Sequence, residues 1–167
     1  ADLVKDLPGN NEAKAETIDN NLQHEIVKKM SSNSVYYGKL SEMLKKIILQ
    51  RKIEAMSYEE YLRQVVELAE AILHPENSGS YPDGIKDSAA RRALYDHFEA
   101  NFELTIDVDG AIRVSIRPEW KRNFQKQQRI RLAIYQKLLL HSYSEDKATE
   151  ETQNVFDIAQ RQEEYDV

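Results

Sequence analysis

The amino-acid sequence predicts a mainly α-helical protein, a bundle of about six helices, with a short β-hairpin as the alternative to a further helix near residues 103–117. Three observations predict this class. Apolar residues recur at intervals of three and four along most of the chain, which is the period of an amphipathic helix. Residues that cap helices stand before several of these runs, and turn-forming clusters separate them.

Residues 1–11 are predicted to be a connector, because Pro8-Gly9-Asn10-Asn11 is a turn-forming cluster. Residues 12–143 are predicted to form the helical domain. Its first helix should begin near Glu12 and carry one apolar stripe, which consists of Ile18, Leu22, Ile26, Val27 and Met30.

Two amphipathic helices are predicted between Val35 and Leu68. Ser34 is a candidate N-cap for the first of them, which should end near Ala55. Ser57 and Glu60 have the spacing of a capping box, which predicts that a new helix begins there. That helix should end at His74-Pro75, because proline disfavours helical geometry in the residue before it.

Aromatic residues gather near the ends of these two helices, at Tyr36, Tyr37, Tyr58 and Tyr61. Tyrosine is common both in cores and at interface hot spots. Of the two roles we favour packing at the end of the helical pair.

Residues 76–86 are the longest turn-rich stretch, and they are predicted to be either a surface loop or the joint between two lobes. A fourth helix should follow, capped by Asp87 or Ser88, and should bury Ala90, Leu94 and Phe98.

Residues 103–117 allow two structures. Leu104, Ile106 and Val108, and then Ile112, Val114 and Ile116, alternate with polar residues around Asp109-Gly110. This pattern is typical of a hairpin, which we favour slightly over a helix.

After Pro118, a helix is predicted over residues 123–141, with an apolar stripe of Phe124, Ile130, Ala133, Ile134 and Leu138. The last helix should run from about Thr149 to Tyr165. Residues 144–167 carry eight acidic and two basic residues, so we expect an acidic C-terminal helix or tail that docks loosely.

Composition excludes several classes of function. The net charge of −6 argues against a general nucleic-acid or membrane binder, and the absence of cysteine excludes disulfides and thiolate chemistry. No apolar run approaches the length of a membrane helix, and we expect a cytoplasmic protein. The chain begins without methionine, and we interpret it as a piece of a larger protein.

Residues suited to catalysis are sparse. The four histidines are widely scattered without ligand spacing, and the five glycines stand singly, which argues against a phosphate-binding loop. Asp6 with Glu12-Ala13-Lys14 superficially has a nuclease-like spacing, but no strands are predicted there to hold the carboxylates. We therefore expect no catalytic, cofactor-binding or metal-binding residue in this chain.

One segment, residues 117–131, is strongly basic and contains two aromatic residues. The candidate partner-binding residues within it are Arg117, Trp120, Lys121, Arg122, Lys126 and Arg129. Three interpretations stay open: a protein-docking stripe, a DNA-backbone contact, and a solvated helix face with Trp120 in the core.

A series of short sequence motifs, called words below, occurs in order between Ala13 and Leu140. The words are Thr17-Ile18-Asp19-Asn20-Asn21, Val35-Tyr36-Tyr37, Leu40-Ser41-Glu42, Tyr58-Glu59-Glu60-Tyr61-Leu62, Val66-Glu67-Leu68-Ala69, Tyr81-Pro82, Ala90-Arg91-Arg92-Ala93-Leu94-Tyr95-Asp96, Trp120 and Asn123. The series resembles the C-terminal helical region of the R subunit, the motor and restriction subunit, of type I restriction enzymes. In that family a Leu- and Ala-rich helix tends to occupy the region of residues 103–117.

The resemblance implies a function in assembly. This chain would dock the ATP-dependent DNA translocase and nuclease onto the methyltransferase core, so that its partners would be the methyltransferase (M) and specificity (S) subunits. The parent chain would be an ATP-dependent type I site-specific deoxyribonuclease that uses ATP and Mg²⁺ in earlier domains and meets DNA through the complex. The alternatives are a DNA-contacting helical module of the same subunit and an unrelated helical adaptor.

Overall fold

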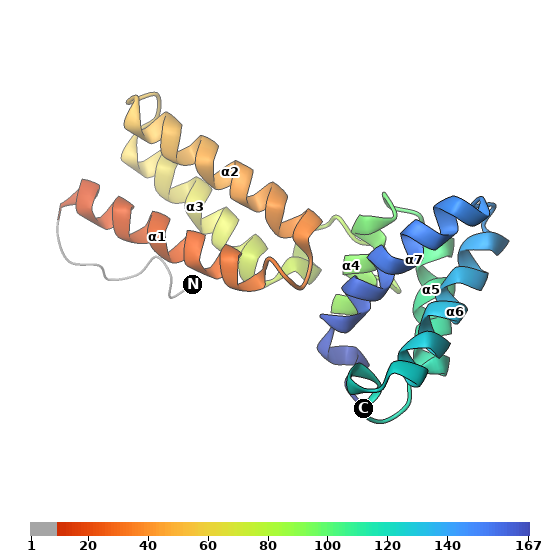
Figure 1. The fold of residues 1–167 in the computed structure, drawn as a ribbon. Coiled ribbons are helices and arrows are strands. Elements are labelled where there is room, and N and C mark those ends of the chain that lie inside the picture. Colours follow the sequence, from red (N-terminus) through yellow and green to blue (C-terminus); the bar gives the residue numbers. More distant parts are fainter. Residues whose placement is uncertain (1–9) are drawn as a thin grey trace. The chain divides into compact units, whose positions relative to one another are not determined.

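The computed structural model describes residues 10–167, which form seven α-helices and three short 3₁₀ helices, with no strand in this range (Figure 1). The chain divides into two compact units between Ser80 and Tyr81. The division falls inside residues 76–86, for which the sequence allowed either a loop or a joint. A mainly helical fold was predicted, and it is confirmed.

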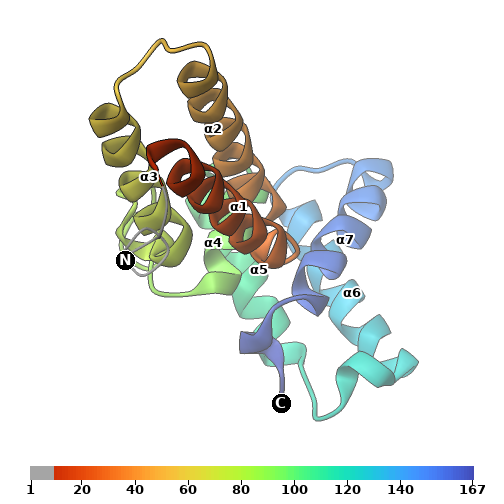
Figure 2. The same ribbon diagram turned by 90° about the vertical axis from the view of Figure 1, so that its left-hand side faces the viewer.

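Unit 1 contains three helices, which are α1 (Asn11–Lys29), α2 (Ser34–Lys52) and α3 (Tyr58–Leu73), followed by the 3₁₀ helix η1 (Pro75–Asn77). Each of the three helices packs against the other two, and α1 lies beside α2 and α3 in both ribbon views (Figures 1 and 2). Tyr36, Tyr37 and Tyr61 are buried, so the packing role predicted for these tyrosines is confirmed.

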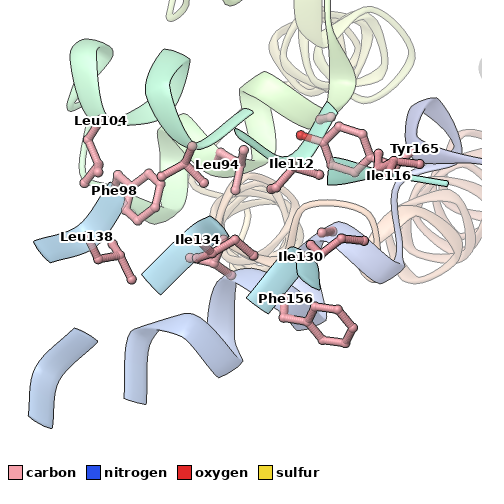
Figure 3. Packing of buried hydrophobic residues seen from close by; sticks show 14 of the residues in the cluster. Leu94, Phe98, Leu104, Ile112, Ile116, Ile130, Ile134, Leu138, Phe156 and Tyr165 are labelled. Atoms are coloured by element: carbon pink, nitrogen blue, oxygen red, sulfur yellow. The ribbon is translucent and has the colours of Figure 1, made fainter. Parts of the chain in front are cut away.

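Unit 2 contains four α-helices and two 3₁₀ helices. They are α4 (Ala89–His97), α5 (Phe102–Ser115), η2 (Trp120–Arg122), α6 (Phe124–Leu140), α7 (Glu145–Gln160) and η3 (Glu163–Tyr165). Helix α6 packs against α5 on one side and α7 on the other. Leu94, Ile112, Ile134 and Phe156 belong to one buried cluster that draws on all four α-helices (Figure 3).

Every one of the seven α-helices in residues 10–167 starts at a side-chain cap. The side chains that accept a hydrogen bond from the backbone N–H three residues on are Asn10, Asn33, Ser57, Ser88, Asn101, Asn123 and Ser144. The caps predicted at Ser57 and Ser88 are confirmed. The cap predicted at Ser34 is wrong by one residue, because Asn33 accepts from the N–H of Tyr36 and Ser34 begins the helix.

The hairpin predicted as the favoured structure of residues 103–117 is wrong, because Phe102–Ser115 form helix α5. Leu104, Val108 and Ile112 are four residues apart, so they satisfy a helical period as well as the alternating one. Val114 belongs only to the alternating pattern and is 74% exposed. Packing of Leu104, Val108 and Ile112 in the core of unit 2 therefore favours the helix over the hairpin.

A buried polar cluster joins the three helices of unit 1. Asp19 of α1 accepts hydrogen bonds from Nη2 of Arg51 on α2, at 2.7 Å, and from the Tyr61 hydroxyl on α3, at 2.8 Å. The same hydroxyl lies 3.0 Å from the Ala15 carbonyl oxygen, and Arg51 also pairs with Glu12 at 2.5 Å. Because one ionic group comes from each of two helices, the cluster fixes their relative register.

Asp109 is the centre of the corresponding cluster in unit 2, and it is fully buried in the middle of α5. It accepts hydrogen bonds from Nε of Arg91 at 2.8 Å, Nε of Arg113 at 2.8 Å and the Tyr165 hydroxyl at 2.7 Å. Burial raises the pKa of Asp109, but these hydrogen bonds outweigh burial and hold the pKa below its ordinary value.

The C-terminal residues are integral to unit 2. Tyr165 is fully buried, and the Glu164 carboxylate accepts from the Ser88 hydroxyl at 2.7 Å and from Nη2 of Arg113 at 2.9 Å. Helix α7 begins at Glu145, four residues before the predicted start, and buries Val155 and Phe156. The predicted loose docking of residues 144–167 is therefore wrong, because five of their apolar side chains reach the core: Ala148, Val155, Phe156, Ala159 and Tyr165.

Candidate protein-docking surface

The segment before α6 is fixed by Trp120, the only tryptophan of the chain. The Trp120 side chain is buried, its Nε1 donates to the Tyr165 carbonyl oxygen at 2.7 Å, and its ring meets Phe156 edge-on at 5.8 Å between centroids. The chain reaches this position through Glu119, whose φ of 61° is left-handed. Trp120 cannot contact a partner from this position, so its predicted role as a binding residue is wrong and the core interpretation holds.

Three of the predicted basic residues are engaged within the chain. Arg117 donates to the carbonyl oxygens of Val114 and Ile116, at 2.9 and 2.6 Å, at the C-terminal end of α5. Lys126 donates to the Pro118 carbonyl oxygen at 2.6 Å, and Lys121 pairs with Asp166. These side chains satisfy carbonyl groups and one carboxylate of their own unit, which a charge count along the sequence does not reveal.

Arg122 and Arg129 are different. Both are exposed, and neither guanidinium forms a hydrogen bond or an ion pair with any residue in the range 10–167. Arg122 also lines a small pocket of about 260 Å³, together with Trp120, Lys121 and Asp166. Of the six predicted binding residues, these two carry charges that are not paired with another residue in the range 10–167.

The outward face of α6 carries apolar side chains that the sequence analysis assigned wrongly or missed. Phe124 was predicted to be part of the apolar stripe that packs inward, but it is 71% exposed. Leu132 and Leu140, which were not singled out, are 56% and 75% exposed. Each step of eight residues turns about 80° around a helix, so Leu132 lies opposite the buried Ile130, Ile134 and Leu138, while Phe124 and Leu140 flank it on either side at the two ends of α6.

Helix α6 is also positively charged as a whole, since residues 124–140 contain four basic residues and no acidic one. Two of the four are drawn inward. Lys126 contacts Pro118, and Arg131 donates to Gln153 on α7 while its guanidinium lies 3.7 Å from the centroid of the Phe156 ring. The outward face therefore combines exposed Phe and Leu side chains with Arg129 and no carboxylate. We call Arg122, Phe124, Arg129, Leu132 and Leu140 the α6 face.

Within residues 10–167 no group of three His, Asp or Glu side chains is placed to hold a metal ion. The histidines pair singly with carboxylates; His97 contacts Glu151, and His141 lies 2.8 Å from Asp107. Glu12 is engaged by Arg51, while Asp6 lies outside the described residues.

No helix of the described part of the chain is both long enough and apolar enough to cross a membrane. Comparison of the chain with family models, with curated proteins and with solved structures finds no match. The resemblance to R subunits therefore rests on the ordered words of the sequence.

The structure shows where some of those words fall. Asp19 and Tyr61 belong to the buried cluster of unit 1, and Arg91 belongs to that of unit 2. The Tyr81 hydroxyl donates to Asp96 at 2.6 Å. This hydrogen bond links the motif Tyr81-Pro82 to the last residue of the motif that begins at Ala90. These residues position the helices of their own units, and none of them belongs to the α6 face.

Proposed function

We propose that this chain is an assembly domain, namely the C-terminal domain of the R subunit of a type I restriction enzyme. It would dock the ATP-dependent translocase and nuclease of the parent chain onto the core formed by the methyltransferase and specificity subunits, in the cytoplasm. In this proposal the chain itself has no catalytic activity. ATP and Mg²⁺ are used by other domains of the parent chain.

The observation that carries the proposal is the α6 face. Large apolar side chains exposed along one helix, with two unpaired arginines close to them in the sequence, have the composition of a protein interface. Aromatic and arginine side chains supply much of the binding energy in such interfaces, and the arginines can steer an acidic partner surface.

The test measures binding of the purified chain to the purified methyltransferase core encoded beside it. Phe124→Ala and Leu132→Glu should each weaken binding by at least about tenfold, because each removes an apolar anchor. The double variant Arg122→Glu/Arg129→Glu should weaken binding as well. Circular dichroism of each variant checks that the helices are intact.

A matched control reverses two other exposed and unpaired basic residues, in the double variant Lys52→Glu/Arg161→Glu. It changes the net charge by the same amount and leaves the α6 face intact. Equal weakening by both double variants would mean that only net charge matters, and it would contradict docking through the α6 face.

A DNA contact is the second candidate, and the absence of any carboxylate on α6 favours it. Two observations oppose it: most basic residues of the segment bind groups of their own unit, and exposed Phe and Leu side chains gain little from phosphates. We expect the chain to bind duplex DNA no better than about 10⁻⁴–10⁻⁶ M at physiological salt. Sub-micromolar DNA binding that Arg122→Glu/Arg129→Glu abolishes, with assembly intact, would favour the DNA contact instead.

A further inference from the structure

Helices α2 and α3 leave a groove between them on the surface of unit 1. The groove has a volume of about 400 Å³, and Met43, Ile47, Leu68 and Ala71 are among the residues that line it. Ile47 and Leu68 are nearly buried, while Met43 is 50% exposed and open to another molecule. Methionine is flexible and common on binding surfaces, so the groove is suited to receive further side chains.

The two rims of the groove differ in charge. On the α2 rim, Lys46 lines the groove, and Lys39 lies seven residues earlier on the same side of the helix. Both are exposed, and neither forms a hydrogen bond or an ion pair with another residue in the range 10–167. The exposed Glu42 lies between them on the same side of α2, where it pairs with Lys45 at 2.7 Å, and Lys45 and then Lys46 lower its pKa. The α2 rim therefore keeps a net positive charge.

The α3 rim is negative. Glu60 and Glu67 also lie seven residues apart, and Arg63 between them bonds to both, at 2.6 and 2.7 Å. Two carboxylates and one guanidinium leave one net negative charge, and the ion pairs hold these side chains in place. Hydrogen bonds from Arg63 and Gln64 lower the pKa of Glu60 to about 2, so it is charged at neutral pH.

We propose that this groove is a self-association surface, in which two copies of the chain pack α2 and α3 face to face about a two-fold axis parallel to the helices. Such an axis places α2 of one copy on α3 of the other. The positive α2 rim of each copy then faces the negative α3 rim of the other copy. Each contact occurs twice, as in every isologous interface.

The heights of the residues fit this arrangement. The groove is lined by α2 between Met43 and Gln50 and by α3 between Arg63 and Ala71. Lys46 and Glu67 each lie near the middle of these stretches, so the proposal places them at similar heights along the helices of one copy. A rotation about an axis parallel to the helices preserves height. Lys46 of one copy therefore faces the second copy's Glu67. The half-exposed Met43 faces the second copy's groove, where the small Ala71 leaves room for it.

The charge pattern selects a second copy over another occupant. An unrelated helix would need a negative edge toward α2 and a positive edge toward α3, whereas the hairpin of this chain already carries both edges in the required order. The groove consists of residues of unit 1 and the α6 face of residues of unit 2, so the proposal goes beyond the assembly function and does not depend on it.

The test is sedimentation equilibrium of the full 167-residue chain from micromolar to near-millimolar concentration. We expect a reversible monomer–dimer equilibrium that weakens with salt. Lys46→Glu and Glu67→Lys should each weaken the dimer by at least about tenfold, because each places like charges opposite one another twice.

Mixing gives the sharper result. The Lys46→Glu chain and the Glu67→Lys chain should form a mixed dimer, since both contacts between them unite opposite charges, although neither dimerises well alone. The double variant Lys46→Glu/Glu67→Lys should dimerise like the parent. A loss of folding cannot produce this rescue.

Met43→Glu should abolish the dimer, and Leu49→Glu is its matched control. Leu49 is also exposed on α2, at 59%, but does not line the groove. A chain that is monomeric at every concentration would overturn the proposal. A dimer that survives Met43→Glu, or that fails to recover in the mixture, would overturn the groove as its interface, and loss of the dimer with Leu132→Glu would assign it to the α6 face.

Discussion

Each unit is built around a buried aspartate that accepts hydrogen bonds from an arginine and a tyrosine, but the two clusters are not equally complete. Asp19 in unit 1 receives one guanidinium, from Arg51, whereas Asp109 in unit 2 receives two. In both, the arginine lies over the tyrosine ring, at 5.3 Å for Arg51 and Tyr61 and at 5.1 Å for Arg113 and Tyr165. In both, that arginine also pairs with a glutamate.

The difference lies in what remains unsatisfied. Nε of Arg51 is buried without a hydrogen-bond partner, while Nε of both Arg91 and Arg113 donates to Asp109. A buried polar group without a partner is destabilising, and a fully bonded network is stabilising and specific. The same residue types therefore position the helices in both units, but unit 2 depends more strongly on its central carboxylate than unit 1 does.

The largest effect should follow from removal of the central carboxylates. Asp109→Ala removes the acceptor of two guanidinium groups and a hydroxyl, so it should cost unit 2 about 3–5 kcal/mol. Asp19→Ala should cost unit 1 less, about 2–3 kcal/mol, because it removes the acceptor of only one guanidinium and one hydroxyl.

Urea denaturation checks both values. Fluorescence of Trp120, the single tryptophan, reports on unit 2, and hydrogen exchange of the α1 to α3 amides reports on unit 1. An Asp109→Ala chain with the stability of the parent would mean that the guanidinium groups find other partners, and the comparison would fail.

Acid should remove part of the same interaction from unit 2. Burial raises the pKa of Glu164, but hydrogen bonds from Ser88 and Arg113 outweigh burial, so the pKa values of Glu164 and Asp109 both lie below their ordinary values. The stabilisation is therefore complete above the unfolded-state pKa and is lost as the pH falls through the folded-state pKa. Trp120 fluorescence should show unit 2 weakening progressively below about pH 5. Glu164→Gln should reduce this dependence, and a stability unchanged down to pH 3 would contradict it.

The tyrosine hydroxyls offer a smaller and finer test. Tyr165→Phe removes the hydrogen bond to the charged Asp109 and should cost about 1.5–2 kcal/mol. Tyr61→Phe should cost at least as much, because its hydroxyl lies within hydrogen-bonding distance of both Asp19 and the Ala15 carbonyl oxygen. Both values come from the same denaturation experiments. A clearly smaller loss for Tyr61→Phe would show that the Ala15 contact contributes nothing.

The smallest effects concern the caps. Ser57 only accepts from the N–H of Glu60, whereas Ser88 accepts from the N–H of Arg91 and also donates to Glu164. Ser57→Ala should therefore cost about 0.5–1 kcal/mol and Ser88→Ala about 1–2 kcal/mol. Thermal denaturation of the two variants checks the order, and equal losses would mean that the contact between Ser88 and Glu164 contributes nothing.

Local patterns predicted most of the helices because their signals are local. The proline after His74 and the serine at position 57 act on the backbone within a few residues, and the ends of α3 agree with them. The Ser57 and Glu60 capping box is only half present, because the Glu60 carboxylate accepts from Arg63 and Gln64 side chains.

Residues 103–117 show where local patterns fail. Asp109-Gly110 has the composition of a turn, but Asp109 lies mid-helix, where Arg113 reaches it from the next turn and Arg91 and Tyr165 reach it from more distant parts of the sequence. The sequence contained one sign of this buried aspartate. Asp109 directly follows Val108, which belongs to an apolar stripe with a spacing of four residues, just as Asp19 directly follows Ile18 in α1.

The candidate site was predicted only in part for the same reason. A run of bases in the sequence does not distinguish Lys126, which binds the Pro118 carbonyl, from Arg129, which is uncommitted. The predicted stripe also failed at Phe124, because it precedes Ile130 by six residues, which is about 120° around a helix, and it is exposed while Ile130 is buried.

The buried position of Tyr165 has a practical consequence for expressing unit 2 alone. A truncation that ends at Arg161 would remove the acceptor of the Trp120 indole N–H and the hydroxyl that reaches Asp109, although it shortens the chain by only six residues. The side chain of Val167, by contrast, is 66% exposed. An affinity tag belongs after Val167, and a protease that trims the last turn would act on the stability of the whole unit.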